Sequence, residues 1–153
     1  KFLARERALS IILPLSVGTL ELAGDDTFGE LDVRALLAVF GVPRLDHVGE
    51  GWGGGRSALY RDGDGRATVL VALDWDSEND AAQWEEAVLV YVNEAFDADL
   101  PGFPAPVSCA ATVCWQIGTR AIAFEREGAR TALAFSKTSA DAEALALAIV
   151  PAP

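Results

Sequence analysis

Residues 67–80 read ATVLVALDWDSEND and combine a strand with the start of a helix. Apolar side chains occupy both faces of the alternating pattern along residues 67–75, so we expect a central strand. Ser77, followed by acidic residues, predicts a helix N-cap here. The two faces of the predicted strand consist of Val69, Val71, Leu73 and Trp75 on one side and of Thr68, Leu70, Ala72 and Asp74 on the other.

A hairpin and a helix surround this strand. Residues 57–60 and 67–75 are separated by Arg-Asp-Gly-Asp-Gly-Arg, in which the Asp-Gly pairs supply the positive φ that a hairpin loop demands. Downstream, the apolar residues of the segment 81–96 recur at helical spacing. Residues 97–106 hold three prolines and are predicted to form a loop.

The same order of elements returns later in the chain. Residues 121–124 and 131–136 read as two further strands, and Thr138 to Asp141 repeats the helix start of Ser77 to Asp80. The repeat units cover about residues 50–96 and 114–150. We therefore predict an α+β fold, in which an antiparallel sheet is built from two strand-strand-helix repeats with the helices packed on one face.

The N-terminal part is predicted to hold two helices and a strand. Residues 2–13 are mostly apolar and stop at Pro14, which indicates a short helix, and residues 17–22 indicate a strand. Thr27 and Glu30 have capping-box spacing, so a second helix is expected from Thr27 to about Phe40. We expect residues 1–16 to be the remainder of an upstream segment and residues 17–153 to be a single domain. The chain has no Met and opens on Lys1, so we expect a piece of a longer protein.

Charge and composition exclude several partner classes. The 12 Lys and Arg against 23 Asp and Glu give a net charge of −11, which repels nucleic acid and anionic lipid surfaces. No apolar run approaches the length of about 20 residues that a membrane span needs. The sequence predicts neither a nucleic-acid partner nor membrane insertion.

A search for metal, cofactor and nucleophile motifs is mostly negative. His47 is the single histidine and is expected in a short solvated turn or helix, so a multi-histidine zinc site and a catalytic triad are both excluded. The glycine-rich stretch 49–55 leads into a strand instead of a helix, unlike a phosphate-binding loop. We predict no cofactor and no metal, and a close backbone approach at these glycines. Cys109 and Cys114, the two cysteines, are predicted either as a small-loop disulfide of an exported protein or as two buried thiols.

The densest polar and aromatic cluster lies at the predicted strand-to-helix junction. It supports three interpretations: a cleft for a peptide or glycan, a small hydrolase that uses Asp74 and Asp76, or a purely structural junction. In the structural interpretation Asp76 or Ser77 caps the helix, Asp74 pairs with an arginine such as Arg56, and Trp75 fills the core. The candidate binding residues are Trp52, Arg56, Asp74, Trp75 and Asp76.

Three strings of residues together resemble a known group of proteins. They are Asp-Thr-Phe-Gly-Glu at 26–30, Gly-Trp-Gly-Gly-Gly-Arg at 51–56 and Trp-Asp-Ser-Glu-Asn-Asp-Ala at 75–81. This order is similar to the C-terminal region of exported prokaryotic proteins whose upstream part resembles a zinc metallopeptidase with an HExxH helix. The resemblance covers about residues 17–96, and it differs at Gly55, where the group usually has an acid.

The resemblance implies a non-catalytic accessory domain outside the cytoplasm. Such a domain packs on or covers an upstream peptidase-like domain of the same polypeptide, whose catalytic residues lie elsewhere. The expected partners are that upstream domain and, in the binding-module interpretation, a peptide or glycan.

Overall fold

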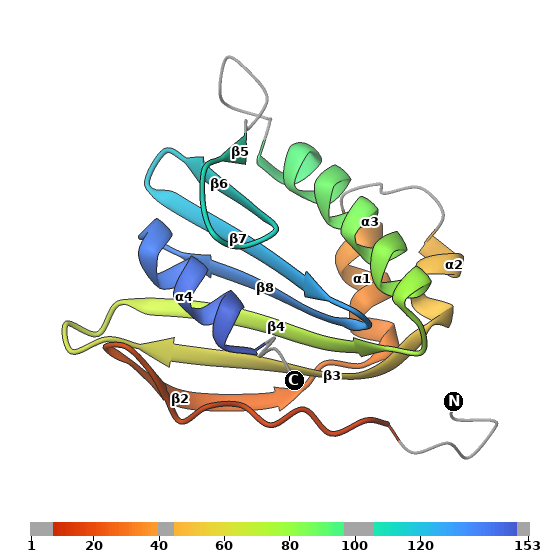
Figure 1. The fold of residues 1–153 in the computed structure, drawn as a ribbon, viewed down its shortest axis with the longest axis horizontal. Helices are drawn as coiled ribbons and strands as arrows, with labels where there is room; N and C mark the ends of the chain where they lie inside the picture. The colour runs from red at the N-terminus through yellow and green to blue at the C-terminus, as the bar shows by residue number, and fades with distance from the viewer. Residues whose placement is uncertain (1–7, 40–44, 97–105, 150–153) are drawn as a thin grey trace.

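The computed structural model describes residues 8–39, 45–96 and 106–149, and within them the strands form one antiparallel sheet (Figure 1). Its order is β1-β2-β3-β4-β8-β7-β6-β5, so each half of the sheet is a meander and the halves join at β4 and β8. The strands are β1 (Ser16–Val17), β2 (Leu20–Thr27), β3 (Trp52–Arg61), β4 (Ala67–Trp75), β5 (Pro106–Val107), β6 (Val113–Ile117), β7 (Arg120–Glu127) and β8 (Arg130–Ser136).

Four helices cover this sheet within the described residues. The prediction of an α+β fold with an antiparallel sheet and two strand-strand-helix units is confirmed, because β3, β4 and α3 form one unit and β7, β8 and α4 form the other. The helices are α1 (Glu30–Val39), α2 (Leu45–Glu50), α3 (Glu78–Phe96) and α4 (Ser139–Ile149).

The helices occupy both faces of the sheet, which corrects the expectation of one covered face. On one face α1, α2 and α3 enclose a core of large side chains that includes Leu73, Trp75 and Trp84. On the other face α4 packs on a core rich in alanine, with Ala72 and Ala132 among its members. The alternation of β4, which puts Leu73 and Trp75 on one face and Leu70 and Ala72 on the other, requires a cover on each side.

The segment 8–15 is extended and lies on the α4 face, so the predicted short helix is wrong over residues 8–13. The Leu9 amide donates to the Gly53 carbonyl at 2.9 Å, and the Tyr60 hydroxyl donates to the Pro14 carbonyl at 2.8 Å. Ile11, 6% exposed, belongs to the alanine-rich core. Residues 8–15, which we expected to belong to an upstream segment, therefore pack as part of this domain. Residues 2–7 of the predicted helix lie outside the described residues.

Two of the three predicted helix starts are confirmed. The Asp80 amide donates to the Ser77 hydroxyl at the start of α3, and the Asp141 amide donates to the Thr138 hydroxyl at the start of α4. The first start is different, because Thr27 ends β2 and α1 begins at Glu30. The predicted helix end at residues 40–43 and the loop at 97–105 lie outside the described residues.

Residues 52–55 of the glycine-rich stretch belong to β3, which begins at Trp52, five residues before the predicted strand start, whereas Gly49 lies in α2. The predicted close approach is confirmed: a Cβ on Gly54 would collide with the Leu9 backbone, and one on Gly55 with the Phe28 carbonyl oxygen. The acid that the resemblance places at residue 55 therefore has no room here. These glycines allow segment 8–15 and the end of β2 to lie directly against β3.

We predict that Gly55→Ala lowers the free energy of unfolding by about 1–3 kcal/mol, because the new Cβ meets a backbone carbonyl that cannot move aside freely. Gly24→Ala is the matched control, since a Cβ there meets nothing within 4 Å. Urea denaturation of both variants measures the difference. Equal stability of the two variants would contradict the close approach.

Candidate functional site

Asp74, the first predicted candidate residue, is bound inside the fold by Arg130. Its two carboxylate oxygens accept hydrogen bonds from Nε and Nη2 of Arg130 at 2.6 and 2.9 Å, across the register pair that joins β4 and β8. Asp74 is 6% exposed, whereas the Arg130 side chain is 37% exposed. The hydrogen bond with Asp74 raises the pKa of Arg130, which keeps the guanidinium charged. The expected partner Arg56 is therefore replaced by Arg130.

Trp75 lies in the core on the opposite face from Asp74. Trp75 is 2% exposed, and its ring centroid lies 5.7 Å from that of Trp84. Its Nε1 donates to the Thr131 hydroxyl at 3.0 Å, so the polar atom of the indole is also satisfied internally. This ring has no free face on which a sugar could stack.

The other three candidate residues also have contacts within the domain. Trp52 is half-buried and donates from Nε1 to the Phe28 carbonyl at 3.1 Å. Arg56 forms an ion pair with Asp25 of β2. Asp76 is exposed, and its amide donates to the Gly51 carbonyl at 2.8 Å.

The five candidate residues do not share a cleft. Cross-strand partners lie on the same face, so the pairing of Trp52 with Trp75 places both on the face of α1, α2 and α3. Arg56 pairs with Ala72 and therefore lies on the α4 face, which Asp74 also faces. The sheet itself separates the tryptophans from Arg56 and Asp74.

A groove that the sequence did not indicate lies on the α4 face, between segment 8–15 and α4. Its volume is about 370 Å³. Extended backbone directs alternate side chains to opposite sides, and the groove accordingly takes every second residue of the segment. The lining residues are Ser10, Ile12 and Pro14 from the segment, Arg130 from β8, and Ala148 and Ile149 from α4.

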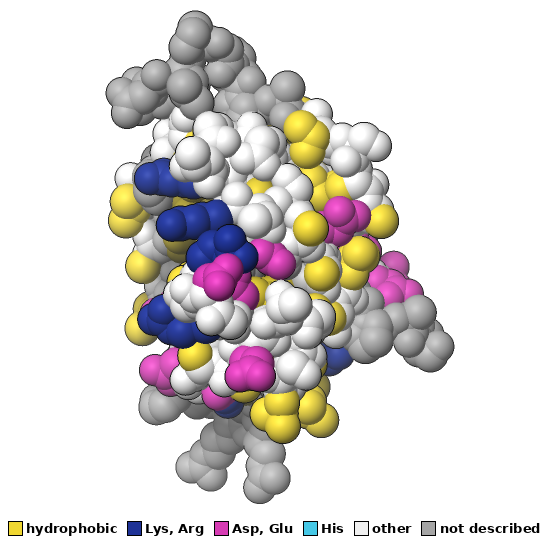
Figure 2. Space-filling view, turned by 90° about the vertical axis from the view of Figure 1, so that its left-hand side faces the viewer, with side chains coloured by type: hydrophobic (Ala, Val, Ile, Leu, Met, Phe, Trp, Pro, Cys, Tyr) yellow, Lys and Arg dark blue, Asp and Glu magenta, His cyan; other side chains and the backbone are white. Residues whose placement is uncertain are grey.

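Large apolar side chains are exposed along the same segment. Leu9 is 53% exposed, Ile12 is 89% exposed and Leu15 is 80% exposed. Figure 2 shows the end of the molecule at which β3 turns into β4: Lys and Arg side chains gather on one side, next to acidic side chains, and hydrophobic side chains lie on both sides and at the lower edge.

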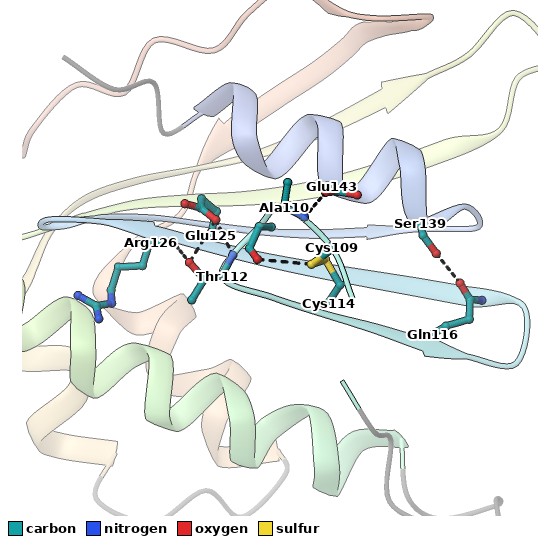
Figure 3. The surroundings of a disulfide bond; sticks show 10 residues. Cys109, Ala110, Thr112, Cys114, Gln116, Glu125, Arg126, Ser139 and Glu143 are labelled. Atoms are coloured by element: carbon teal, nitrogen blue, oxygen red, sulfur yellow. Dashed lines mark hydrogen bonds between the residues drawn. A yellow bond between two sulfur atoms is a disulfide. The ribbon is translucent and has the colours of Figure 1, made fainter. Parts of the chain in front are cut away.

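Cys109 and Cys114 form a disulfide, which decides between the two states that the sequence left open. The loop that it closes lies between α4 and β7 (Figure 3). The Ala110 amide donates to Glu143 of α4 at 2.5 Å, and the Thr112 amide donates to Glu125 of β7 at 2.6 Å. The disulfide loop therefore connects the last helix to the second half of the sheet.

The described residues contain no group of three or more His, Cys, Asp or Glu side chains that could hold a metal ion. His47 lies on α2 with its side chain 74% exposed, 3.8 Å from a carboxylate oxygen of Glu50, in agreement with the predicted solvated position. No helix among the described residues has both the length and the apolar character needed to cross a membrane.

Comparison with known proteins gives a family without a described activity. A family model described as a domain of unknown function (DUF8575) matches residues 18–146. No curated protein and no solved structure matches the chain. The match covers the whole sheet except β1, together with most of α4, and it begins after segment 8–15.

We predict that Asp74→Ala lowers the free energy of unfolding by about 1–3 kcal/mol, because it removes two charge-assisted hydrogen bonds and leaves Arg130 without its buried partner. Asp64→Ala, which removes an exposed carboxylate from an ion pair with Arg66, is the control and is expected to cost less than about 1 kcal/mol. Chemical denaturation measures both. Similar losses in the two variants would show that the Asp74 pair is not a structural element of the core.

We predict that reduction of the disulfide lowers the unfolding temperature by about 4–8 °C, since closing a loop this short contributes about 2 kcal/mol. Calorimetry with and without a thiol reductant measures the shift. The Cys109→Ser, Cys114→Ser double variant should be insensitive to the reductant. An unchanged unfolding temperature of the wild-type protein after reduction would refute the contribution of the bond.

Proposed function

The chain belongs to the DUF8575 family of domains of unknown function, and we propose that it is a non-catalytic accessory module of an exported polypeptide, which packs on or covers a preceding peptidase-like domain. The observation that carries this proposal is the placement of segment 8–15. The segment lies before the region matched by the family model, is bound to the sheet, and exposes Leu9, Ile12 and Leu15. Exposed apolar side chains held on an ordered backbone are typical of an interaction surface.

The anchoring of the segment supports a fixed position for whatever precedes it. The backbone hydrogen bond from Leu9 to Gly53 and the burial of Ile11 hold the segment against the sheet. A preceding domain on the same polypeptide is thereby kept close to this face, at an effective concentration of roughly millimolar. Even a modest contact surface is then sufficient for stable packing.

The surroundings of Asp74 and Trp75 support a non-catalytic module. Both side chains use their polar atoms within the fold, Asp74 with Arg130 and Trp75 with Thr131. A glycan-binding cleft needs an accessible aromatic ring, and an acid/base hydrolase needs a carboxylate that can reach its substrate. The geometry therefore favours the accessory module over the glycan-binding module and over the hydrolase.

Export is supported by the disulfide and by the resemblance of the three sequence strings. Disulfides persist in oxidising compartments outside the cytoplasm. The strings at 26–30, 51–56 and 75–81 resemble those of exported proteins with a peptidase-like upstream part. Both features agree with an accessory role beside an extracytoplasmic peptidase-like domain.

We predict that the gene product carries an HExxH-containing domain before this one, and that the two remain associated after the connection between them is cut. A protease-cleavable sequence inserted immediately before Ala8 provides the test, with size-exclusion chromatography after cleavage. Co-elution of the two parts, and a higher unfolding temperature of the peptidase-like part in the presence of this domain, are the expected results.

Two outcomes would contradict the proposed function. One is a gene product without a peptidase-like domain, or one whose two parts elute separately with unchanged unfolding temperatures. The other is proteolytic activity of residues 1–153 alone that survives repurification and metal replacement.

A further inference from the structure

We infer that the groove between segment 8–15 and α4 is the surface on which the preceding domain docks, and that the docking part of that domain is apolar and uncharged. This inference rests on the proposed function and adds to it the face of the module and the chemistry of its partner. It is carried by the shape of the groove, by the exposure of its walls and by its charge.

The shape of the groove fits an inserted apolar side chain. One wall is an extended segment and the other is a helix, and the space between them measures about 370 Å³, enough for several side chains. The wall formed by the segment is fixed on its inner side by Ile11, which is 6% exposed, and on its outer side presents Ile12, which is 89% exposed. Ile11 is thus buried in the domain, whereas the neighbouring Ile12 is exposed and available for contact with a partner.

The second wall is also apolar. Ala148 and Ile149 of α4 line the groove, and Leu147 beside them is 36% exposed. Of the 11 residues of α4, Asp141 and Glu143 are the charged ones, and both lie in its first half. The half of α4 that borders the groove therefore offers no charged side chain to a partner.

Charge identifies the kind of partner. Among the described residues that line the groove, Arg130 is the charged one, and its guanidinium is already paired with Asp74. The described lining is thus nearly neutral on a molecule with a net charge of −11. Two copies of this chain would repel each other through these net charges, whereas an uncharged apolar surface meets no such opposition. A different, apolar partner is therefore favoured over a second copy.

Chain connectivity identifies that partner as the preceding domain. Residues 10, 12 and 14, which form one wall of the groove, lie immediately before the region matched by the family model. A domain that precedes them on the same polypeptide is tethered beside the groove. A second groove of comparable volume, formed by β2, β3 and β4, has Asp25 and Asp26 among its lining residues, and Arg56 pairs with the first of them but not with the second.

The test compares Ile12→Asp with Leu31→Asp in the complete gene product. Both side chains are exposed, at 89% and 80%, but Leu31 lies on α1, away from the groove. In the isolated domain both variants should therefore unfold within about 2 °C of the wild type. Hydrogen exchange of the backbone amides, followed by mass spectrometry, reports whether residues 8–15 and α4 are covered.

In the complete gene product we expect slower exchange in residues 8–15 and in α4 than in the isolated domain. Ile12→Asp should accelerate this exchange roughly ten- to hundredfold, the factor that corresponds to burying one isoleucine side chain, and Leu31→Asp should leave it unchanged. Equal behaviour of the two variants, with the cleaved parts still co-eluting, would overturn the docking face and leave the proposed function standing. Separate elution of the cleaved parts would overturn the proposed function. Dimerisation of the isolated domain that Ile12→Asp abolishes would show that a second copy occupies the groove.

Discussion

The pairing of β4 with β8 at the middle of the sheet is the constraint on which the rest of the structure depends. Both strands carry apolar side chains on both faces, so each face must be covered by other elements to keep these side chains out of water. The faces differ in side-chain size, because valine, leucine and tryptophan dominate one core and alanine the other. Three helices enclose the first core, and the second is closed by α4 and by an extended segment from the opposite end of the chain.

The alanine-rich face explains why the N-terminal segment belongs to the domain. Small side chains let α4 approach the sheet closely, but one helix of 11 residues covers only part of this face. The segment takes the remaining part, where Gly54 leaves space for the Leu9 backbone and Ile11 fills the core. The groove is the gap between these two covers, so it results directly from closing one sheet face with two unequal elements.

Local sequence patterns predicted much of the fold, whereas contacts between distant residues were not predictable. The two faces of β4 and the helix caps at Ser77 and Thr138 depend on neighbours in sequence, and the structure confirms them. Thr27 has capping-box spacing but joins β2, because its pairing with Arg56 extends the ladder to β3. The partner of Asp74 is 56 residues away, and only the register of β4 with β8 identifies it. The groove was missed because its walls come from opposite ends of the chain.

The two edges of the sheet have a consequence for the behaviour of the domain at high concentration. At one edge β5 has two residues, one of which is Pro106, and at the other β1 has two residues beside a β2 that carries Glu21, Asp25 and Asp26. Short strands, proline and acidic side chains all obstruct the addition of a further strand from another molecule. The sheet is thereby protected against edge-to-edge aggregation, so the domain should stay monodisperse at concentrations where an open-edged sheet would associate.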